Sequence, residues 1–431
     1  MAAIVAALTM KPQSSRLAKL TKFLGGSAIY AGGVGLQFVT IVLLARLLGP
    51  TEFGKYSIYA AITLVAIEVL AVGSGDVMIK NVALRPRRFS ALYGHSLLVG
   101  LVVLIPATAA VLLAIVGYEL SAAPWLLLAM VAAVEIASGR VMVLGEQAFI
   151  AHKQAARANL LRLGVNGART AAAAIAFLSA PGLDLFAWIA VQALASALAA
   201  VAVLIAIRAL LGPPRFVLLG GRIAGGLPFA GTQIVRMTQM QVDRLLIGLV
   251  ASPYVVGVYA AASRVISLGT LPMVTLLRMT YPHFFVHGAR GMRAVLPFGM
   301  KVLGGLMAVA AVTVACFYFA APLLPLLLGE EYTDAVPAAQ LLAPICFAYA
   351  FQYAGGDMLS GGGHQNLRFI STVLNLACIA AGILIFGREG GPIAVVVAVL
   401  AGNALGAAMT WMFVLVTALR EPNPPAASSS R

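Results

Sequence analysis

Residues 184–207 read DLFAWIAVQALASALAAVAVLIAI, and no charged residue follows the first one. A helix needs about 20 apolar residues to cross a hydrocarbon core of about 30 Å, so this stretch is long enough to span a membrane. Its apolar residues are continuous, whereas a transmembrane β-strand alternates apolar and polar residues. Because a helix satisfies its own backbone hydrogen bonds in lipid, the stretch predicts a transmembrane helix.

Similar stretches recur along nearly the whole chain. Hydrophobic residues make up 61% of the 431 residues and charged residues 10%, against about 45–50% and about 25% in a soluble domain. The sequence therefore predicts an all-α polytopic membrane protein with about 12 transmembrane helices. The expected spans are residues 24–48, 56–77, 90–116, 123–150, 159–180, 184–207, 223–250, 254–280, 296–320, 335–359, 367–387 and 391–419.

These spans divide the chain into two sets of six. We expect a first lobe over residues 23–210 and a second over 223–420, joined by a cytoplasmic linker at 211–222. A cytoplasmic segment, residues 1–22, precedes them, and the Pro- and Ser-rich composition of 421–431 predicts a disordered tail. The cysteines lie inside apolar runs and the histidines lack metal-ligand spacing, so we predict neither metal nor cofactor.

The charges of the loops orient the spans. If both termini are cytoplasmic, the basic loop residues face the cytoplasm, apart from Lys55 and Arg388. This is the positive-inside pattern, and a miscounted helix would invert it. The acidic residues expected on the outer side are Glu52, Glu119, Asp184, Glu330, Glu331, Asp334 and Glu389. The net charge of +15 suits anionic lipid rather than nucleic acid, because it is spread over short loops.

A short motif occurs once in each half of the chain. Residues 48–61 (LGPTEFGKYSIYAA) and 251–262 (ASPYVVGVYAAA) align Gly54 with Gly257 and Tyr56 with Tyr259. Both copies lie in the outer loop between the first and second spans of a six-helix set. Two halves in the same orientation are expected of transporters that rock about a central site.

Three blocks of sequence resemble the Wzx-type polysaccharide flippases of the MOP superfamily. They are residues 45–56 (ARLLGPTEFGKY), residues 243–248 and 256–261 (DRLLIG and VGVYAA), and residues 326–332 (LLLGEEY). The resemblance implies two pseudo-symmetric six-helix lobes around a central cavity, in a bacterial inner membrane. It also implies a polyprenyl-pyrophosphate-linked oligosaccharide as cargo, with a polysaccharide polymerase and other assembly proteins as partners in making O-antigen, capsule or exopolysaccharide.

Basic residues inside the spans are candidates for binding this cargo. Each costs about 2.5–3.5 kcal/mol at mid-bilayer unless it faces protein, a partner or water. Our interpretation is that arginines line a cationic cavity, since guanidinium groups stay charged and match phosphate oxygens two at a time. The alternative is internal ion pairing, for instance of Arg162 with Glu146 or of Arg244 with a neighbouring carboxylate. The predicted substrate-binding residues are Arg236, Arg264, Arg169, Arg140, Gln233, Gln239, Asp243, Tyr30 and Gln37.

Acidic residues inside the spans are candidates for coupling transport to a cation or a proton. A carboxyl group in a low-dielectric cavity holds its proton more readily than one in water. The alternative for each is a salt bridge between helices, which also perturbs a carboxylate. The candidates are Glu68, Asp76, Glu135 and Asp357.

Two other functions are compatible with a membrane fold. A cation-coupled multidrug exporter of the same superfamily would need acidic cavity walls, whereas the charge inside these spans is mainly basic. A membrane glycosyltransferase or polymerase would need catalytic carboxylates or histidines on a sizeable outer loop, and the outer loops here are short. The sequence therefore favours a flippase that is not an enzyme.

Overall fold

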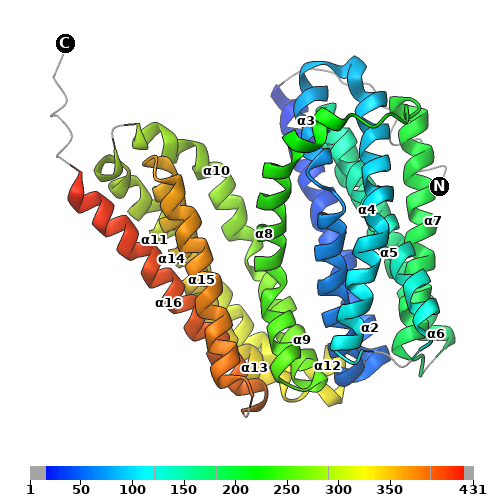
Figure 1. Ribbon diagram of the computed structural model, residues 1–431. Helices are drawn as coiled ribbons and strands as arrows, with labels where there is room; N and C mark the ends of the chain where they lie inside the picture. Colours follow the sequence, from blue (N-terminus) through cyan, green and yellow to red (C-terminus); the bar gives the residue numbers. More distant parts are fainter. Residues whose placement is uncertain (1–15, 121–122, 181, 290, 389, 422–431) are drawn as a thin grey trace. The chain divides into compact units, whose positions relative to one another are not determined.

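The computed structural model describes residues 16–120, 123–180, 182–289, 291–388 and 390–421. Within these residues every regular element is a helix, so the predicted fold class is confirmed. The predicted segment 1–22 and tail 421–431 lie for the most part outside them. The chain forms two compact units, Met1–Gln241 and Val242–Arg431. The predicted linker, residues 211–222, joins α7 to α8, and the division between the units lies further along, inside α8 (Figure 1).

The helices follow one another with short connections. Those before the division are α2 (Arg16–Val69), α3 (Ser74–Leu84), α4 (Phe89–Gly117), α5 (Trp125–Ala151), α6 (Ala155–Ser179) and α7 (Leu185–Leu211), followed by α8 (Gly220–Val250). Those of the second unit are α9 (Pro253–Gly269), α10 (Leu271–Gly288), α11 (Met292–Ala320), α12 (Leu324–Leu328), α13 (Ala335–Leu342), α14 (Ile345–Gly361), α15 (Gln365–Phe386) and α16 (Gly391–Arg420).

The helices account for the predicted spans. Among the described residues, eight helices are long and apolar enough to cross a membrane, or nine if the bent pair α9 and α10 is one span. Helix α2 holds two predicted spans, separated by a kink at Gly49 (φ 67°, ψ 172°) beside Pro50. The predicted spans 159–180 and 223–250 correspond to α6 and α8, the least hydrophobic of the long helices, which fall outside this count.

Three predicted spans differ from single helices. The expected span 56–77 breaks after Val69, because Val72 and Gly73 have positive φ angles of 42° and 64° before α3 begins. The expected span 254–280 is α9 and α10, bent by 45° at Thr270. The expected span 335–359 is α13 and α14, which are separated at Ala343 and Pro344. Each break lies within a largely apolar stretch, so hydrophobicity alone does not reveal it.

Helix α5 is the central helix of the first unit. It packs against α2, α3, α4, α6 and α7. Its neighbours approach closely because small residues face them: a Cβ on Gly139 would overlap the side chain of Ile67, and one on Gly145 would contact Val203 at 2.5 Å. Glu135 and Arg140 of α5 therefore lie in the interior of the unit, where α5 meets five other helices.

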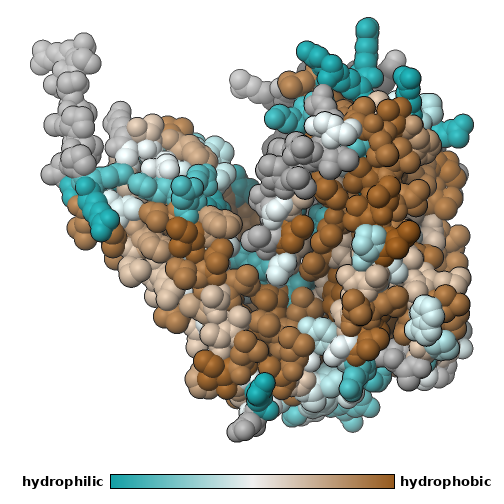
Figure 2. Space-filling view, in the orientation of Figure 1, coloured by the Kyte–Doolittle hydropathy of each residue, from teal (hydrophilic) through white to brown (hydrophobic). Residues whose placement is uncertain are grey.

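The surface of the first unit fits a membrane. Large apolar side chains such as Leu101, Ile105 and Leu198 are exposed on its flanks. Figure 2 shows this hydrophobic flank between two more hydrophilic ends, with the strongest hydrophilic colour at the upper end. The upper end carries the α3–α4, α5–α6 and α7–α8 connections (Figure 1). Its exposed basic residues are Lys80, Arg85, Arg87, Arg88, Lys153, Arg208 and Arg215. The arrangement matches the positive-inside pattern of the loops.

Candidate functional site

Four helices of the first unit join in one polar network. Arg169 of α6 donates a hydrogen bond from Nη2 to Glu135 Oε1 of α5, at 3.0 Å, and from Nε and Nη2 to Ser196 Oγ of α7, at 3.2 and 3.0 Å. Gln192 of α7 donates to the same Glu135 oxygen at 3.0 Å. The Tyr56 hydroxyl of α2 donates to Gln192 Oε1 at 2.6 Å. We call Tyr56, Glu135, Arg169, Gln192 and Ser196 the Arg169 network.

The two charges of this network differ in exposure. The side chain of Glu135 is 4% exposed, whereas that of Arg169 is 30% exposed. Glu135 Oε2 has no hydrogen-bond partner among the described residues. The carboxylate therefore lies in the interior of the unit, and the guanidinium connects it to the surface near the middle of α6. An anion could reach Arg169 from that exposed side, and Glu135 and Ser196 would hold the guanidinium in place.

Arg169 and Glu135 were predicted from the sequence as site residues, whereas Tyr56, Gln192 and Ser196 were not. A usable signal was present, since Gln192 and Ser196 are four residues apart in the apolar stretch 184–207. Residues at this spacing share a helix face, and a polar pair there marks a buried polar contact.

The face of α6 that carries Arg169 makes further contacts on either side of that residue. Arg162 forms an ion pair with Glu146 of α5, as the alternative interpretation predicted. Asn166 donates to the Gly33 carbonyl of α2 at 2.9 Å. The hydroxyl oxygens of Thr170 and of Thr40 in α2 form a hydrogen bond of 2.8 Å. Of the predicted substrate-binding residues on α2, Gln37 is exposed, and the side chain of Tyr30 lies outside the described residues.

A second charged cluster lies at the break between α2 and α3. Arg140 of α5 is 3% exposed and donates from Nη2 to Ser74 Oγ at 3.1 Å. It interacts electrostatically with Glu68, on one side of the break, and with Asp76, on the other. Its Nε and Nη1 atoms have no hydrogen-bond partner among the described residues. The structure thus brings a predicted substrate-binding arginine together with two of the predicted coupling acids.

The remaining predicted residues lie on α8, α9 and α14. Asp243 accepts a hydrogen bond from the Tyr259 hydroxyl at 2.6 Å. Gln233, Gln239 and Arg264 are half-buried. The side chain of Arg236 lies outside the described residues.

The fourth predicted coupling acid, Asp357 of α14, forms an ion pair with Arg368 of α15 at 3.3 Å. Arg368 also donates to the Ser360 hydroxyl at 2.6 Å and to the Tyr281 hydroxyl at 3.3 Å. The salt-bridge alternative is therefore the one observed for Asp357. The same holds for Glu135, which pairs with Arg169.

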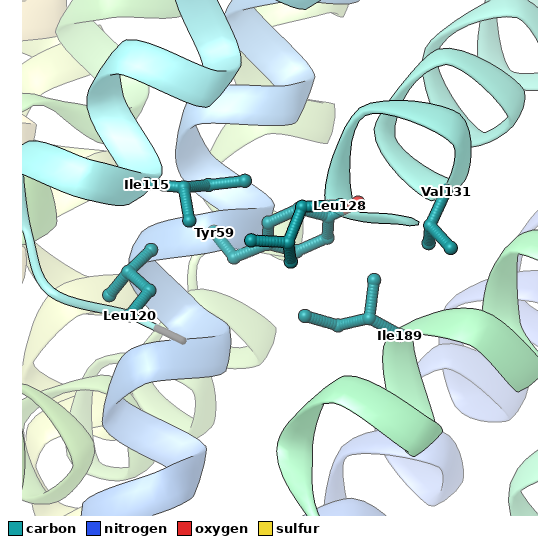
Figure 3. Close-up of a pocket in the computed structure, with 6 residues that line it drawn as sticks. All are labelled: Tyr59, Ile115, Leu120, Leu128, Val131 and Ile189. Carbon is teal, nitrogen blue, oxygen red and sulfur yellow. The ribbon is translucent and has the colours of Figure 1, made fainter. Parts of the chain in front are cut away.

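An apolar pocket lies beside the Arg169 network. Figure 3 shows five aliphatic side chains gathered around the ring of Tyr59, which interacts electrostatically with Glu135. Because its lining carries no charge, this pocket offers nothing to a phosphate. The lining residues are Tyr59, Ile115, Leu120, Leu128, Val131 and Ile189. In the described part of the chain, no group of His, Cys, Asp and Glu has the arrangement of a metal site.

The chain matches one known protein family in sequence and several solved transporters in fold. Residues 25–286 match the family described as polysaccharide biosynthesis protein. No curated protein matches the chain. Similar solved structures include an inward-facing multidrug resistance MATE family transporter of the MOP superfamily, at 16% identity over 89% of this chain and 94% of that one, with a TM-score of 0.72.

Two further structures support the same fold. The outward-facing form of such a MATE transporter is 17% identical over 92% of this chain and 94% of that chain, with a TM-score of 0.60. A MOP superfamily transporter from Pyrococcus furiosus is 17% identical over 93% and 96%, with a TM-score of 0.60. At these identities the likeness concerns the fold, which is that of MOP superfamily transporters.

Proposed function

The chain belongs to the polysaccharide biosynthesis protein family, and from this premise we propose that it is a flippase for a polyprenyl-pyrophosphate-linked oligosaccharide. It would move this lipid across the bacterial inner membrane by alternating access, with both termini in the cytoplasm, and deliver it to a polymerase and other assembly proteins. The family match at residues 25–286 contains the whole Arg169 network.

The observation that carries this proposal is the position of Arg169. Its guanidinium lies near the middle of a helix in a lipid-embedded unit, where a charge costs about 2.5–3.5 kcal/mol without a partner or water. Two helices fix it through Glu135 and Ser196, yet almost a third of the side chain is exposed. Because Nε and Nη2 already donate to Ser196 and Glu135, Nη1 is the nitrogen of this fixed, partly exposed guanidinium that can donate to a phosphate group.

The division of polar and apolar surface suits the rest of the cargo. The flanks of the unit are hydrophobic, so a polyprenyl chain can stay in lipid while the phosphate contacts Arg169. We retain the other predicted substrate-binding residues in this proposal. They are Arg236, Arg264, Arg140, Gln233, Gln239, Asp243, Tyr30 and Gln37.

A second candidate is a cation-coupled multidrug exporter. It is favoured by the buried carboxylate of Glu135, since an acid inside a lobe could bind a cationic drug or a coupling cation. Against it, that carboxylate already pairs with Arg169 in the first unit, and Asp357 pairs with Arg368 in the second. Acids neutralised in this way attract a cation only weakly.

Reconstitution distinguishes the two candidates. The full chain is placed in liposomes with a fluorescent undecaprenyl-pyrophosphate-linked oligosaccharide, and a membrane-impermeant reductant bleaches the outer leaflet. A flippase exposes the inner-leaflet lipid, so bleaching proceeds well beyond the half that is reached in protein-free liposomes. Bleaching that stops at this half, together with efflux of a cationic dye, would replace the flippase with the exporter. Native mass spectrometry of the purified protein provides a second test, because a flippase should retain the polyprenyl-linked oligosaccharide.

A further inference from the structure

We propose that Glu135 takes up one proton when an anionic phosphate binds Arg169, so that substrate and proton bind this unit together. The inference rests on the proposed function for the identity of the anion. It adds a thermodynamic link that the proposed function does not require, because a flippase could bind its substrate without exchanging protons.

The hydrogen bonds of Glu135 leave one of its oxygens available. Oε1 accepts from both Arg169 and Gln192, at 3.0 Å each, while Oε2 has no partner among the described residues. The side chain is 4% exposed, so water screens the carboxylate poorly. Oε2 is therefore the atom that can receive a proton without breaking an existing hydrogen bond.

The charge on Glu135 is balanced mainly by Arg169. Helix α2 brings two tyrosines, Tyr56 and Tyr59, toward it. Residues 101–117 of α4 and 185–207 of α7 contain no charged residue. On α5 itself, Arg140 interacts with Glu68 of α2 and Asp76 of α3 at the helix break.

The other charges of neighbouring helices lie away from this point. On α5 and α6, Glu146 pairs with Arg162, and Lys80 of α3 is exposed at the end of the unit. Among the charged groups named here, Arg169 is the one in direct contact with Glu135, so a change in its environment acts on that carboxylate directly.

Binding of an anion upsets this balance. With the pair alone, one positive and one negative charge compensate each other. A phosphate that contacts Arg169 adds negative charge beside the buried carboxylate, and an uncompensated carboxylate in a low-dielectric interior costs several kcal/mol. Transfer of a proton from water to Oε2 makes Glu135 neutral, while the guanidinium keeps its own protons and binds the phosphate. No other bond is made or broken.

The link must act in both directions. If phosphate binding favours protonation, protonation favours phosphate binding by the same factor. Uptake of one proton on binding makes the affinity fall as pH rises, by up to about tenfold per pH unit.

Calorimetry measures this proton directly. Binding of farnesyl pyrophosphate to the purified full chain in nanodiscs is titrated at several pH values, in pairs of buffers with different ionisation enthalpies. Farnesyl pyrophosphate exchanges protons of its own on binding. This contribution is measured with Glu135→Gln and subtracted from the wild-type value. The matched control is Glu146→Gln, on the same helix, whose carboxylate also pairs with an arginine of α6. Size-exclusion chromatography confirms that each variant is folded.

The expected result is that the wild type and Glu146→Gln take up more protons than Glu135→Gln, by a difference that approaches one. Glu135→Gln should still bind the probe, with the weaker pH dependence of the probe alone. Equal proton uptake in all three proteins would overturn the inference and leave the flippase standing. Failure of the wild type to bind the probe, together with no lipid exchange in the liposomes, would overturn both. If Glu135→Gln misfolds, the wild type alone still provides the test: at a pH where the free probe is already fully ionised, binding without proton uptake refutes the inference.

Discussion

Replacing Gly73 with alanine tests whether the break in the second span is fixed by packing. Gly73 has φ 64° and ψ 6°, in the left-handed region. An added Cβ would overlap the carbonyl oxygen of Gly226 in α8 and would lie 3.0 Å from the Ala230 nitrogen. All these are backbone atoms, which cannot move aside as a flexible side chain can. The substitution therefore combines backbone strain with an overlap between two helices.

The magnitude follows from these two contributions. The left-handed conformation costs a non-glycine residue about 1–2 kcal/mol. Extra volume in a packed interior typically costs about 1–3 kcal/mol. We therefore expect Gly73→Ala to lower the free energy of unfolding by about 2–5 kcal/mol.

The matched control is Gly182→Ala, in the same compact unit. Gly182 also has a positive φ, of 89°, but no atom lies within 4 Å of its added Cβ. This φ is at least as unfavourable for alanine as that of Gly73. Any larger loss of stability in Gly73→Ala therefore comes from the contact with α8. We measure the free energy of unfolding of both variants in mixed detergent micelles. If Gly73→Ala costs no more than Gly182→Ala, the contact with α8 does not fix the break, and our explanation is wrong.

Three further substitutions test the site. Arg236→Ala should abolish surface polysaccharide while protein abundance in the membrane stays unchanged, and normal polysaccharide would remove Arg236 from the substrate site. Tyr56→Phe removes the donor to Gln192 Oε1 and should cost about 1–3 kcal/mol of unfolding free energy if that oxygen is left without a partner; an unchanged value would mean that water replaces the hydroxyl. Glu146→Gln should cost less than about 1 kcal/mol and leave lipid exchange unaltered, because its partner Arg162 is 43% exposed. A large loss of exchange would place this pair in the transport machinery.

The spans could be predicted because hydrophobicity is a local property. A run such as residues 184–207 has one stable conformation in lipid whatever its neighbours are, and α7 occupies Leu185–Leu211. The break at Leu70–Gly73 could not be predicted in this way. It depends on the close approach of Gly226, a residue far away in the sequence, to Val72 and Gly73.

The sequence predicted ion pairs between intramembrane charges as an alternative, but it did not give every pair of partners. Arg162 was matched with Glu146 as an alternative, whereas Arg169 and Glu135 were assigned to separate groups of candidates. Yet α5 and α6 form an antiparallel hairpin around a short connection, so residues at similar distances from that connection lie at the same level. Both pairs follow this rule. What the sequence could not supply is the rotation of each helix, which decides whether side chains at one level face each other.

Comparison of the two units indicates which of these pairs is structural. The α14–α15 hairpin of the second unit follows α13 as the fourth and fifth spans of its half, and its pair, Asp357 with Arg368, lies close to the connection. The Glu146–Arg162 pair occupies a similar place in the α5–α6 hairpin. The deeper pair of Glu135 with Arg169 has no counterpart, since Asp357 and Arg368 are the only charged residues of α14 and α15. A hairpin of this kind therefore forms without a deep ion pair. Because burial of two charges contributes little stability in itself, its presence in the first unit alone is better explained by transport than by folding.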